Sequence, residues 1–265
     1  METMTLSREE LEQDRFTEAN LGVALRTLRE VGFVAIENAL LRDWVEEFRV
    51  DYEAVLKRDD EASNEQGNTS PFLNARFLDA RIIDNPFAMQ IIEGAMGNRV
   101  FSYLPYGCNT AEPDCDIQWI HRDSGQLFPE VPVVLPVCSI VINIPLIDFT
   151  IENGATEIWP GSHLIFDDSE VLNKPYNVCN DERAAQLLSF QMVVPAGSVV
   201  VRDMRCWHRR MPNRTQTLRS MLALVYFRRL HHVPDDAGIF SATIPPEAWE
   251  HMSERCREVY RFYAR

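Results

Sequence analysis

The sequence predicts a mainly β protein: a double-sheet jelly roll with a helical buttress before it and a helix after it. Two observations predict this class. Short runs rich in β-branched and aromatic residues recur from the middle of the chain onward, and turn residues bound them. Apolar residues at helical spacing occupy the N-terminal part, and residues 246–264 are predicted to form a terminal helix.

The N-terminal buttress is predicted to hold two helices with a short strand between them. Apolar side chains recur at helical spacing in the first helix, predicted over 17–31, at Leu21, Leu25, Leu28 and Val31. Gly32 ends this helix, and a strand is predicted over 33–36. The second helix, predicted over 41–58, carries Trp44, Phe48 and Tyr52. The polar segment 59–71 is predicted to be a loop.

The jelly-roll core is predicted over about residues 98–228. Its candidate strands share β-branched and aromatic residues between turn signals, and they are 100–103, 117–123, 138–146, 193–201 and 218–227. No linker rich in glycine, serine or proline divides the 265 residues, so we expect one domain over 1–265. Within it, 1–60 would be the buttress and 229–265 a C-terminal extension.

The amino-acid composition indicates which binding partners and which cellular compartment to expect. The chain has 40 acidic and 26 basic residues and a net charge of −14, which argues against nucleic acid and against anionic membrane surfaces. No stretch approaches the roughly 20 apolar residues of a membrane span, and the N-terminus is too charged for a signal peptide. The six cysteines form no CxxC pair, as expected for thiols in a reducing compartment. A cytoplasmic protein is expected.

Two histidines and an aspartate form a candidate metal site. His121 and Asp123 are two residues apart, so on a strand both side chains point to the same side. With His208 they match the facial triad that holds non-haem Fe(II) and leaves three coordination positions open. Each residue also has an ordinary interpretation. His121 can be a plain strand histidine, Asp123 a turn cap, and His208 a core histidine packed by Trp207.

Arg219 is a candidate anchor for a carboxylate. It lies eleven residues after His208, across a turn that contains proline. Strand alternation places it on one face with Met221, Ala223 and Val225, where a guanidinium can bind the far carboxylate of a 2-oxo diacid bidentately. The alternatives are a structural ion pair between Arg219 and Asp203, and a carboxylate anchor at Arg214 instead.

Three longer sequence blocks also resemble segments of a known protein family, in addition to these single residues. They are LREVGFVAIENALLRDWVEEFR near the N-terminus, ENGATEIWPGSH over 152–163, and PAGSVVVRDMRCWHRRMPNRT around His208. In these blocks, from about Leu28 to Phe227, the chain resembles the phytanoyl-CoA dioxygenase family of Fe(II)- and 2-oxoglutarate-dependent oxygenases. The resemblance implies a cupin-like double-stranded β-helix, with Fe(II) on His121, Asp123 and His208. It also implies 2-oxoglutarate held by Arg219, and O2 as the second co-substrate.

The resemblance also implies two further contacts to 2-oxoglutarate, from Gln118 and Thr156. Alternation would place Gln118 on the strand face opposite His121 unless the strand is bulged. The ordinary interpretations are a surface amide and a strand threonine. Asn143 either points into the barrel or pairs with neighbouring backbone. Five arginines near His208 either pair with acidic neighbours or attract the dianionic co-substrate, namely Arg202, Arg205, Arg209, Arg210 and Arg214.

The function implied is oxidation of an unactivated C–H bond, by hydroxylation or by another oxidation that uses the same oxidant. The metal-binding carboxylate disfavours halogenation. A zinc hydrolase is an alternative, although no HExxH motif is present, and a catalytically silent jelly-roll binding protein is another.

The substrate is expected to be a small, mainly apolar molecule from natural-product biosynthesis. The apolar, proline-containing segment 125–137 and Phe72 and Phe77 are candidate pocket walls. These segments can instead pack against the buttress or a second subunit, which leaves a homodimer open.

Overall fold

Two β-sheets form the centre of the protein in a computed structural model that describes residues 3–56, 68–69, 75–103, 107–128, 130–166, 179, 181–231 and 244–262. The larger sheet has seven strands in the order β1-β2-β8-β5-β10-β4-β3. They are β1 (Met4–Thr5), β2 (Phe33–Glu37), β8 (Val199–Asp203), β5 (Ser139–Pro145), β10 (Arg219–Phe227), β4 (Gly107–Ala111) and β3 (Asn68–Thr69). The smaller sheet contains β7 (Phe190–Gln191), β6 (Glu157–Ile158) and β9 (His208–Arg209). The predicted jelly roll is confirmed.

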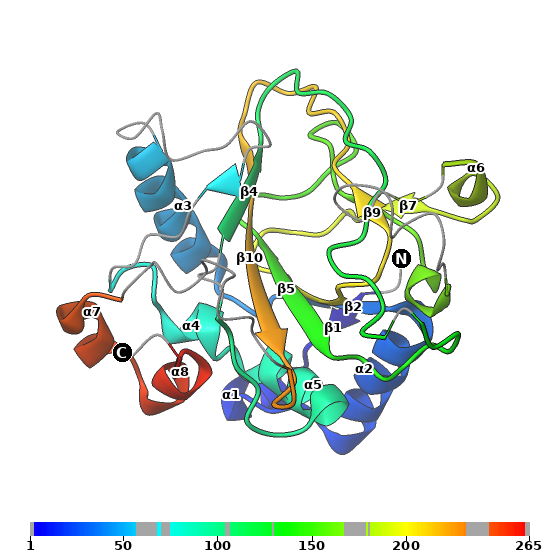
Figure 1. The fold of residues 1–265 in the computed structure, drawn as a ribbon. Coiled ribbons are helices and arrows are strands. Elements are labelled where there is room, and N and C mark those ends of the chain that lie inside the picture. The colour runs from blue at the N-terminus through cyan, green and yellow to red at the C-terminus, as the bar shows by residue number, and fades with distance from the viewer. Residues whose placement is uncertain are drawn as a thin grey trace.

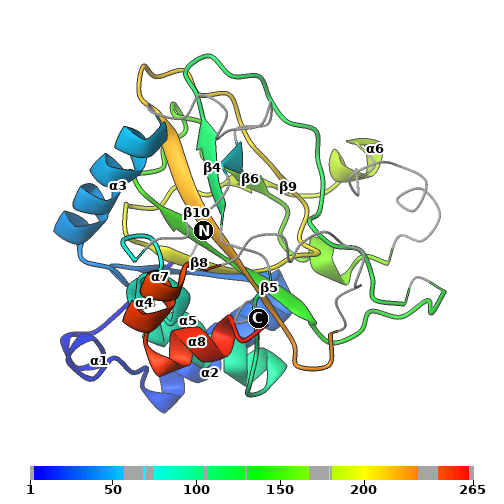
Figure 2. The ribbon, with the colours of Figure 1, turned by 60° about the vertical axis from the view of Figure 1, so that its left-hand side comes forward.

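Most of the helices cover one side of the larger sheet, and the smaller sheet lies on the other side, where α6 also lies (Figures 1 and 2). The helices are α1 (Arg8–Gln13), α2 (Glu18–Val31), α3 (Arg42–Leu56), α4 (Ala80–Ile83), α5 (Pro86–Met96), α6 (Asp181–Ala184), α7 (Pro246–His251) and α8 (Glu254–Val259), with a 3-10 turn at Ser162–Leu164. The main core lies between the sheet and α2, α3 and α5, where Leu28, Phe48 and Ile91 are buried. A second core, which includes Val200 and Ile158, lies between the two sheets.

The N-terminal predictions agree with the structure. The helix expected over 17–31 is α2, Thr17 caps its start, and Gly32 ends it in the left-handed region. The helix expected over 41–58 is α3, and the loop expected over 59–71 falls largely outside the described residues. Among the described residues, no helix has both the length and the apolar character needed to cross a bilayer.

Several element predictions were wrong. The segment 86–96 is a helix, α5, that was not predicted. Residues 100–103 and 117–123 form only isolated bridges, at Phe101 and His121, because neighbouring segments continue as loops. The strand predicted over 193–201 begins at Val199, after a turn in which Gly197 has φ +79°. The single terminal helix is two, because Met252 is extended and Ser253 starts α8 by accepting a hydrogen bond from the amide of Cys256.

Gly32 joins the buttress to the segment that leads to His208. Its φ is +94°, and a Cβ built there would lie 2.2 Å from the Sγ of Cys206 and 2.5 Å from the Nδ1 of His163. Its carbonyl accepts a hydrogen bond of 2.8 Å from the amide of Asp203. A side chain at this position would therefore push the end of α2 away from the turn after β8.

We expect Gly32→Ala to lower the free energy of unfolding by about 2–4 kcal/mol, as left-handed strain adds to overpacking. Gly161 is the matched control, since it has nearly the same backbone conformation (φ +76°, ψ −6°). Its built Cβ meets nothing closer than 3.9 Å. Gly161→Ala should therefore lose only the strain contribution, of about 1 kcal/mol. Urea unfolding of both variants measures the difference, and equal losses would contradict the close packing at Gly32.

Candidate active site

A cavity of about 490 Å³ opens between the two sheets. Strand β10 contributes alternate side chains to its wall, which are Arg219, Met221, Ala223 and Val225, as the alternation predicted. The other residues predicted for the site also line this cavity, namely Gln118, His121, Asp123, Thr156 and His208. Segments far apart in the sequence therefore place the predicted residues around one space.

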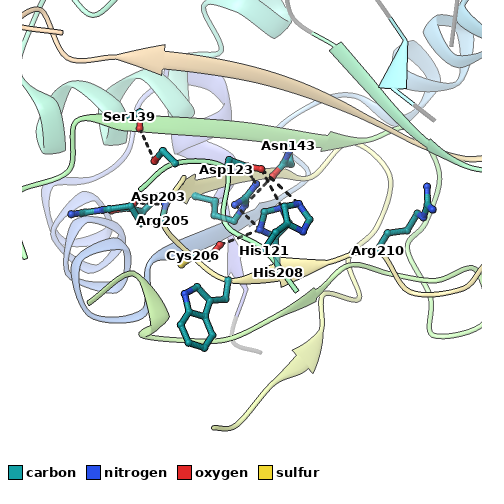
Figure 3. A network of polar contacts seen from close by, with 12 residues as sticks. His121, Asp123, Ser139, Asn143, Asp203, Arg205, Cys206, His208 and Arg210 are labelled. Carbon is teal, nitrogen blue, oxygen red and sulfur yellow. Dashed lines mark hydrogen bonds and ion pairs between the residues drawn. The ribbon is translucent and has the colours of Figure 1, made fainter. Parts of the chain in front are cut away.

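His121, Asp123 and His208 meet on one side of the cavity (Figure 3). One donor atom from each lies within 4.8 Å of the others. The Nε2 atoms of His208 and His121 are 3.5 and 3.9 Å from Oδ1 of Asp123. The two histidines are brought together by backbone pairing, since each amide donates to the other residue's carbonyl at 3.0 and 2.9 Å.

Both imidazoles are oriented by the backbone. The Nδ1 of His121 lies 3.0 Å from the carbonyl oxygen of Trp119, and that of His208 lies 3.1 Å from the carbonyl oxygen of Cys206. An Nδ1–H that donates to these oxygens leaves the Nε2 lone pair directed at the shared centre. Burial lowers the pKa of both rings, and that of His208 falls well below its usual value. Both histidines are therefore neutral at pH 7, the form that binds metals.

Asp123 is an ionised carboxylate held by Arg202. Its side chain is 30% exposed toward the cavity, and its Oδ2 accepts a hydrogen bond of 2.7 Å from Arg202. Burial acts to raise its pKa, but the neighbouring His208, Arg202 and His121 outweigh burial and hold the pKa well below its usual range. The ion pair with Arg202 shows that Asp123 is more than a turn cap. The Trp207 side chain packs with Ile120 and Trp159 in a separate cluster, while His208 lines the cavity.

Arg219 is buried in the same cavity, with 2% of its surface exposed. Its Nε has no hydrogen-bond partner, no ion pair to it is found within the described ranges, and the guanidinium lies 4.7 Å from the ring centre of Phe149. Burial lowers its pKa to about 10, so the group is still charged at pH 7. A buried charge of this kind needs an anionic partner.

Both alternatives for Arg219 fail in the structure. Asp203 pairs with Arg205 at 2.7 Å, so the structural ion pair suggested for Arg219 was wrong. Arg214 is exposed and does not line the cavity.

Gln118, Thr156 and Asn143 also reach the cavity. Gln118 lines the cavity together with His121, because 115–120 is not a regular strand and strict alternation does not hold there. Its Oε1 accepts a hydrogen bond of 3.2 Å from the amide of Arg210. Asn143 is buried, and its Oδ1 lies 3.5 Å from the Nε of Arg202. The contacts of Gln118 and Thr156 to a co-substrate stay predictions.

A family model for phytanoyl-CoA dioxygenase (PhyH) matches residues 28–221. The chain belongs to the phytanoyl-CoA dioxygenase family. It is therefore a 2-oxoglutarate-dependent non-haem iron dioxygenase, with Fe(II), 2-oxoglutarate and O2 as its cofactor and co-substrates. Family membership decides against the zinc hydrolase and the silent binding protein. Two neutral imidazoles and one carboxylate are also the donor set that suits Fe(II) in this class.

Two fungal dioxygenases are among the similar proteins. Dioxygenase af480 of Aspergillus fumigatus is 26% identical over 189 residues, which cover 71% of this chain and 56% of af480. The chain thus spans little more than half of that relative. Multifunctional dioxygenase prhA of Penicillium brasilianum is 26% identical over 251 residues, covering 88% of this chain and 80% of prhA.

Solved structures share the fold of this dioxygenase. AviO1 from Streptomyces viridochromogenes has a TM-score of 0.62 at 20% identity, over 82% of this chain and 99% of AviO1. SnoK, a non-haem α-ketoglutarate-dependent carbocyclase from nogalamycin biosynthesis, has a TM-score of 0.59 at 20% identity, over 80% of this chain and 84% of SnoK.

Four of the five arginines near His208 divide into two groups in this dioxygenase. Arg205 and Arg209 form ion pairs with Asp203 and Glu157, as in the plainer of the two interpretations. Arg202 and Arg210 line the cavity, and there Arg202 also forms its ion pair with Asp123. The sequence did not single out Arg202, because its role depends on a contact with Asp123, 79 residues earlier.

The structure describes only some of the residues that were predicted to form the pocket walls. Phe72 and Pro129 lie outside the described residues. Phe77 was wrong as a wall, because it packs in the helical core with its ring 5.2 Å from that of Phe48. The described part of 125–137 does not line the main cavity, and several of its side chains are exposed, namely Leu127, Phe128, Val131 and Val133.

Proposed function

We propose that His121, Asp123 and His208 hold Fe(II), that Arg219 binds the distal carboxylate of 2-oxoglutarate, and that the enzyme oxidises an unactivated C–H of a small, mainly apolar molecule. One observation carries this proposal: a buried guanidinium with no ion pair in the described chain faces the same cavity as the three donor atoms. A dianionic co-substrate that bridges the metal and Arg219 supplies the missing countercharge. Gln118 and Thr156, in the same cavity, are proposed as further hydrogen-bonding partners of that co-substrate.

The register of the larger sheet supports a division of the cavity into a co-substrate end and a substrate end. Ala223 on β10 pairs with Asn143 on β5, next to Arg202 and the triad. Arg219 lies four residues from Ala223, or about 13 Å along the strand, while Val225 lies two residues away on the other side. We assign the Arg219 end to the co-substrate and the other end to the substrate.

The residues at the substrate end favour an apolar molecule. Val141, Ala223 and Val225 line the cavity there, and Met204 lines it beside the triad. Their role is to hold a C–H bond near the metal position and to exclude water, while the bound Fe(II), 2-oxoglutarate and O2 supply the oxidising chemistry. Hydroxylation and other oxidations of the same bond are both compatible with this arrangement.

Natural-product biosynthesis is the pathway class that we propose. The support comes from the apolar end of the cavity and from the similarity to SnoK, a protein of nogalamycin biosynthesis. A cytoplasmic location and a homodimer stay predictions.

We expect terpenoid, alkaloid or polyketide-like compounds to stimulate succinate release above the rate without substrate. The reason is the apolar lining of the cavity end next to the triad. The measurement is a substrate panel scored by succinate, with product formation confirmed by mass spectrometry. The His208→Ala variant is the control for succinate that does not come from the site. Stimulation only by CoA thioesters or peptides would contradict the proposed substrate class.

A further inference from the structure

Arg202 lies at the centre of the polar network in the cavity. It belongs to β8, between β2 and β5, and only 6% of its side chain is exposed. One terminal nitrogen donates to Oδ2 of Asp123 at 2.7 Å, and the other lies 3.2 Å from Nδ1 of His208. The Nε lies 3.5 Å from Oδ1 of Asn143 on the neighbouring strand. Two adjacent strands therefore fix the guanidinium in position.

This contact gives the two oxygens of Asp123 different surroundings. Oδ2 is occupied by the guanidinium, whereas Oδ1 is the oxygen that lies 3.5 Å from Nε2 of His208 and 3.9 Å from Nε2 of His121. Only Oδ1 therefore faces the point that the two imidazoles share. The carboxylate cannot turn Oδ2 toward this point without losing its charge-assisted hydrogen bond to Arg202.

The number of ligating oxygens decides how many positions the metal has free. A carboxylate can bind a metal through one oxygen or through both. Two imidazoles and one oxygen leave three positions of an octahedral ion open. A second oxygen from Asp123 would close one of them, and a two-point chelating co-substrate together with O2 would no longer fit.

We propose that Arg202 is a positioning residue that confines Asp123 to one ligating oxygen and so keeps the third position of the metal open. This inference rests on the proposed metal site. Asp123 supplies a negative charge and one ligand oxygen, Oδ1. The hydrogen bond from Arg202 keeps the other oxygen, Oδ2, from binding the metal. A competing role, in which Arg202 merely keeps Asp123 in place, makes a different prediction for metal affinity.

Arg205 offers a matched control near the same strand. It too is buried, with 9% of its side chain exposed, and it forms an ion pair with Asp203 at 2.7 Å. Its other contacts go to the carbonyl of Leu135 and the side chain of Gln126, and none goes to the three donor residues. Loss of Arg205 therefore reports the general effect of removing a buried guanidinium from this region.

The test counts exchangeable water ligands on Mn(II), added as the metal alone to the full-length protein, by water-proton relaxation. The wild type should show three waters, the number left by a facial triad. Arg202→Gln, which is too short to reach Oδ2, should show one fewer. Arg202→Lys, which still offers an ammonium group to Oδ2, should restore the wild-type number. Arg205→Gln should also match the wild type.

The Mn(II) affinity of the Arg202→Gln variant distinguishes the proposed positioning role of Arg202 from a role in which it merely keeps Asp123 in place. Arg202→Gln removes a positive charge and adds a metal–oxygen bond, so its Mn(II) affinity should not fall. If Arg202 only held Asp123 in place, affinity would fall by about 10- to 100-fold with the water number unchanged. That result would overturn the inference. A loss of one water ligand in the control variant Arg205→Gln, as well as in Arg202→Gln, would also overturn it. Arg202→Met replaces the glutamine variant if the latter does not fold.

The wild type and His208→Ala distinguish failure of the inference from failure of the site. Mn(II) bound by the wild type but not by His208→Ala, with an unchanged water number in Arg202→Gln, would overturn only the role of Arg202. Equal Mn(II) binding by the wild type and His208→Ala would overturn the metal site itself.

Discussion

Replacement of His208 by alanine is expected to abolish succinate formation and substrate oxidation while the fold is retained. The site has three donor atoms, and loss of a direct ligand should reduce activity by more than the roughly 100-fold that loss of an outer partner can cause. The side chain faces the cavity rather than a packed core, so its removal leaves no new void in the apolar clusters. His121→Ala is expected to behave in the same way. Bound iron per chain and succinate release measure the effect.

His163 is the matched control for this prediction. It is also buried, but its Nε2 contacts the carbonyl oxygen of Arg29, and it is not part of the three-residue cluster. His163→Ala should lower the free energy of unfolding and leave the iron content unchanged. Normal turnover in either His121→Ala or His208→Ala would show that the proposed ligand set is wrong.

Replacement of Arg219 by alanine is expected to raise the KM for 2-oxoglutarate by about ten- to a hundredfold. A charge-assisted bidentate contact contributes about 1.5–3 kcal/mol, and the alanine variant cannot make it. Arg214→Ala should leave the KM near the wild-type value, because Arg214 is exposed outside the cavity. Initial rates of succinate release at varied 2-oxoglutarate concentration measure both variants.

The stability of the Arg219 variants is a second readout. Among the described residues the buried charge of Arg219 has no ion pair to stabilise the free protein, so Arg219→Met should unfold at the same or a higher urea concentration. A raised KM together with undiminished stability would locate the role of Arg219 in co-substrate binding. Equal KM effects at Arg219 and Arg214 would mean that another arginine, such as Arg210 in the same cavity, binds the carboxylate.

Local spacing predicted much of the site from the sequence. His121 and Asp123 are two residues apart, and Arg219 alternates with apolar residues along one strand, so a short window of sequence contains the information. Arg202 carries no such local signal, because it ends an apolar run and its partner is distant in the sequence. For Gln118, alternation left the strand face open, because it holds only where the backbone is a regular strand, and 115–120 is not one.

Helix α5 and three of the shortest strands were not predicted because each lacks a periodic hydrophobic pattern. Helix α5 has six buried residues among its eleven, so it lacks the polar face whose period marks a helix at the surface. Strands β6, β7 and β9 are two residues long, which is too short for any alternation to appear. In these elements the hydrophobic pattern shows no period from which the conformation can be predicted.

The placement of Arg219 and Val225 on one strand has a consequence for engineering. They are six residues apart, so about 20 Å of strand separates the proposed co-substrate anchor from the far end of the cavity. Libraries that vary Val225 and its cross-strand neighbour Val141 can reshape the space offered to new compounds, while the anchor and the three donor residues stay constant. Selectivity and catalytic power should then be adjustable as largely independent traits, and diversification of this scaffold needs few compensating changes.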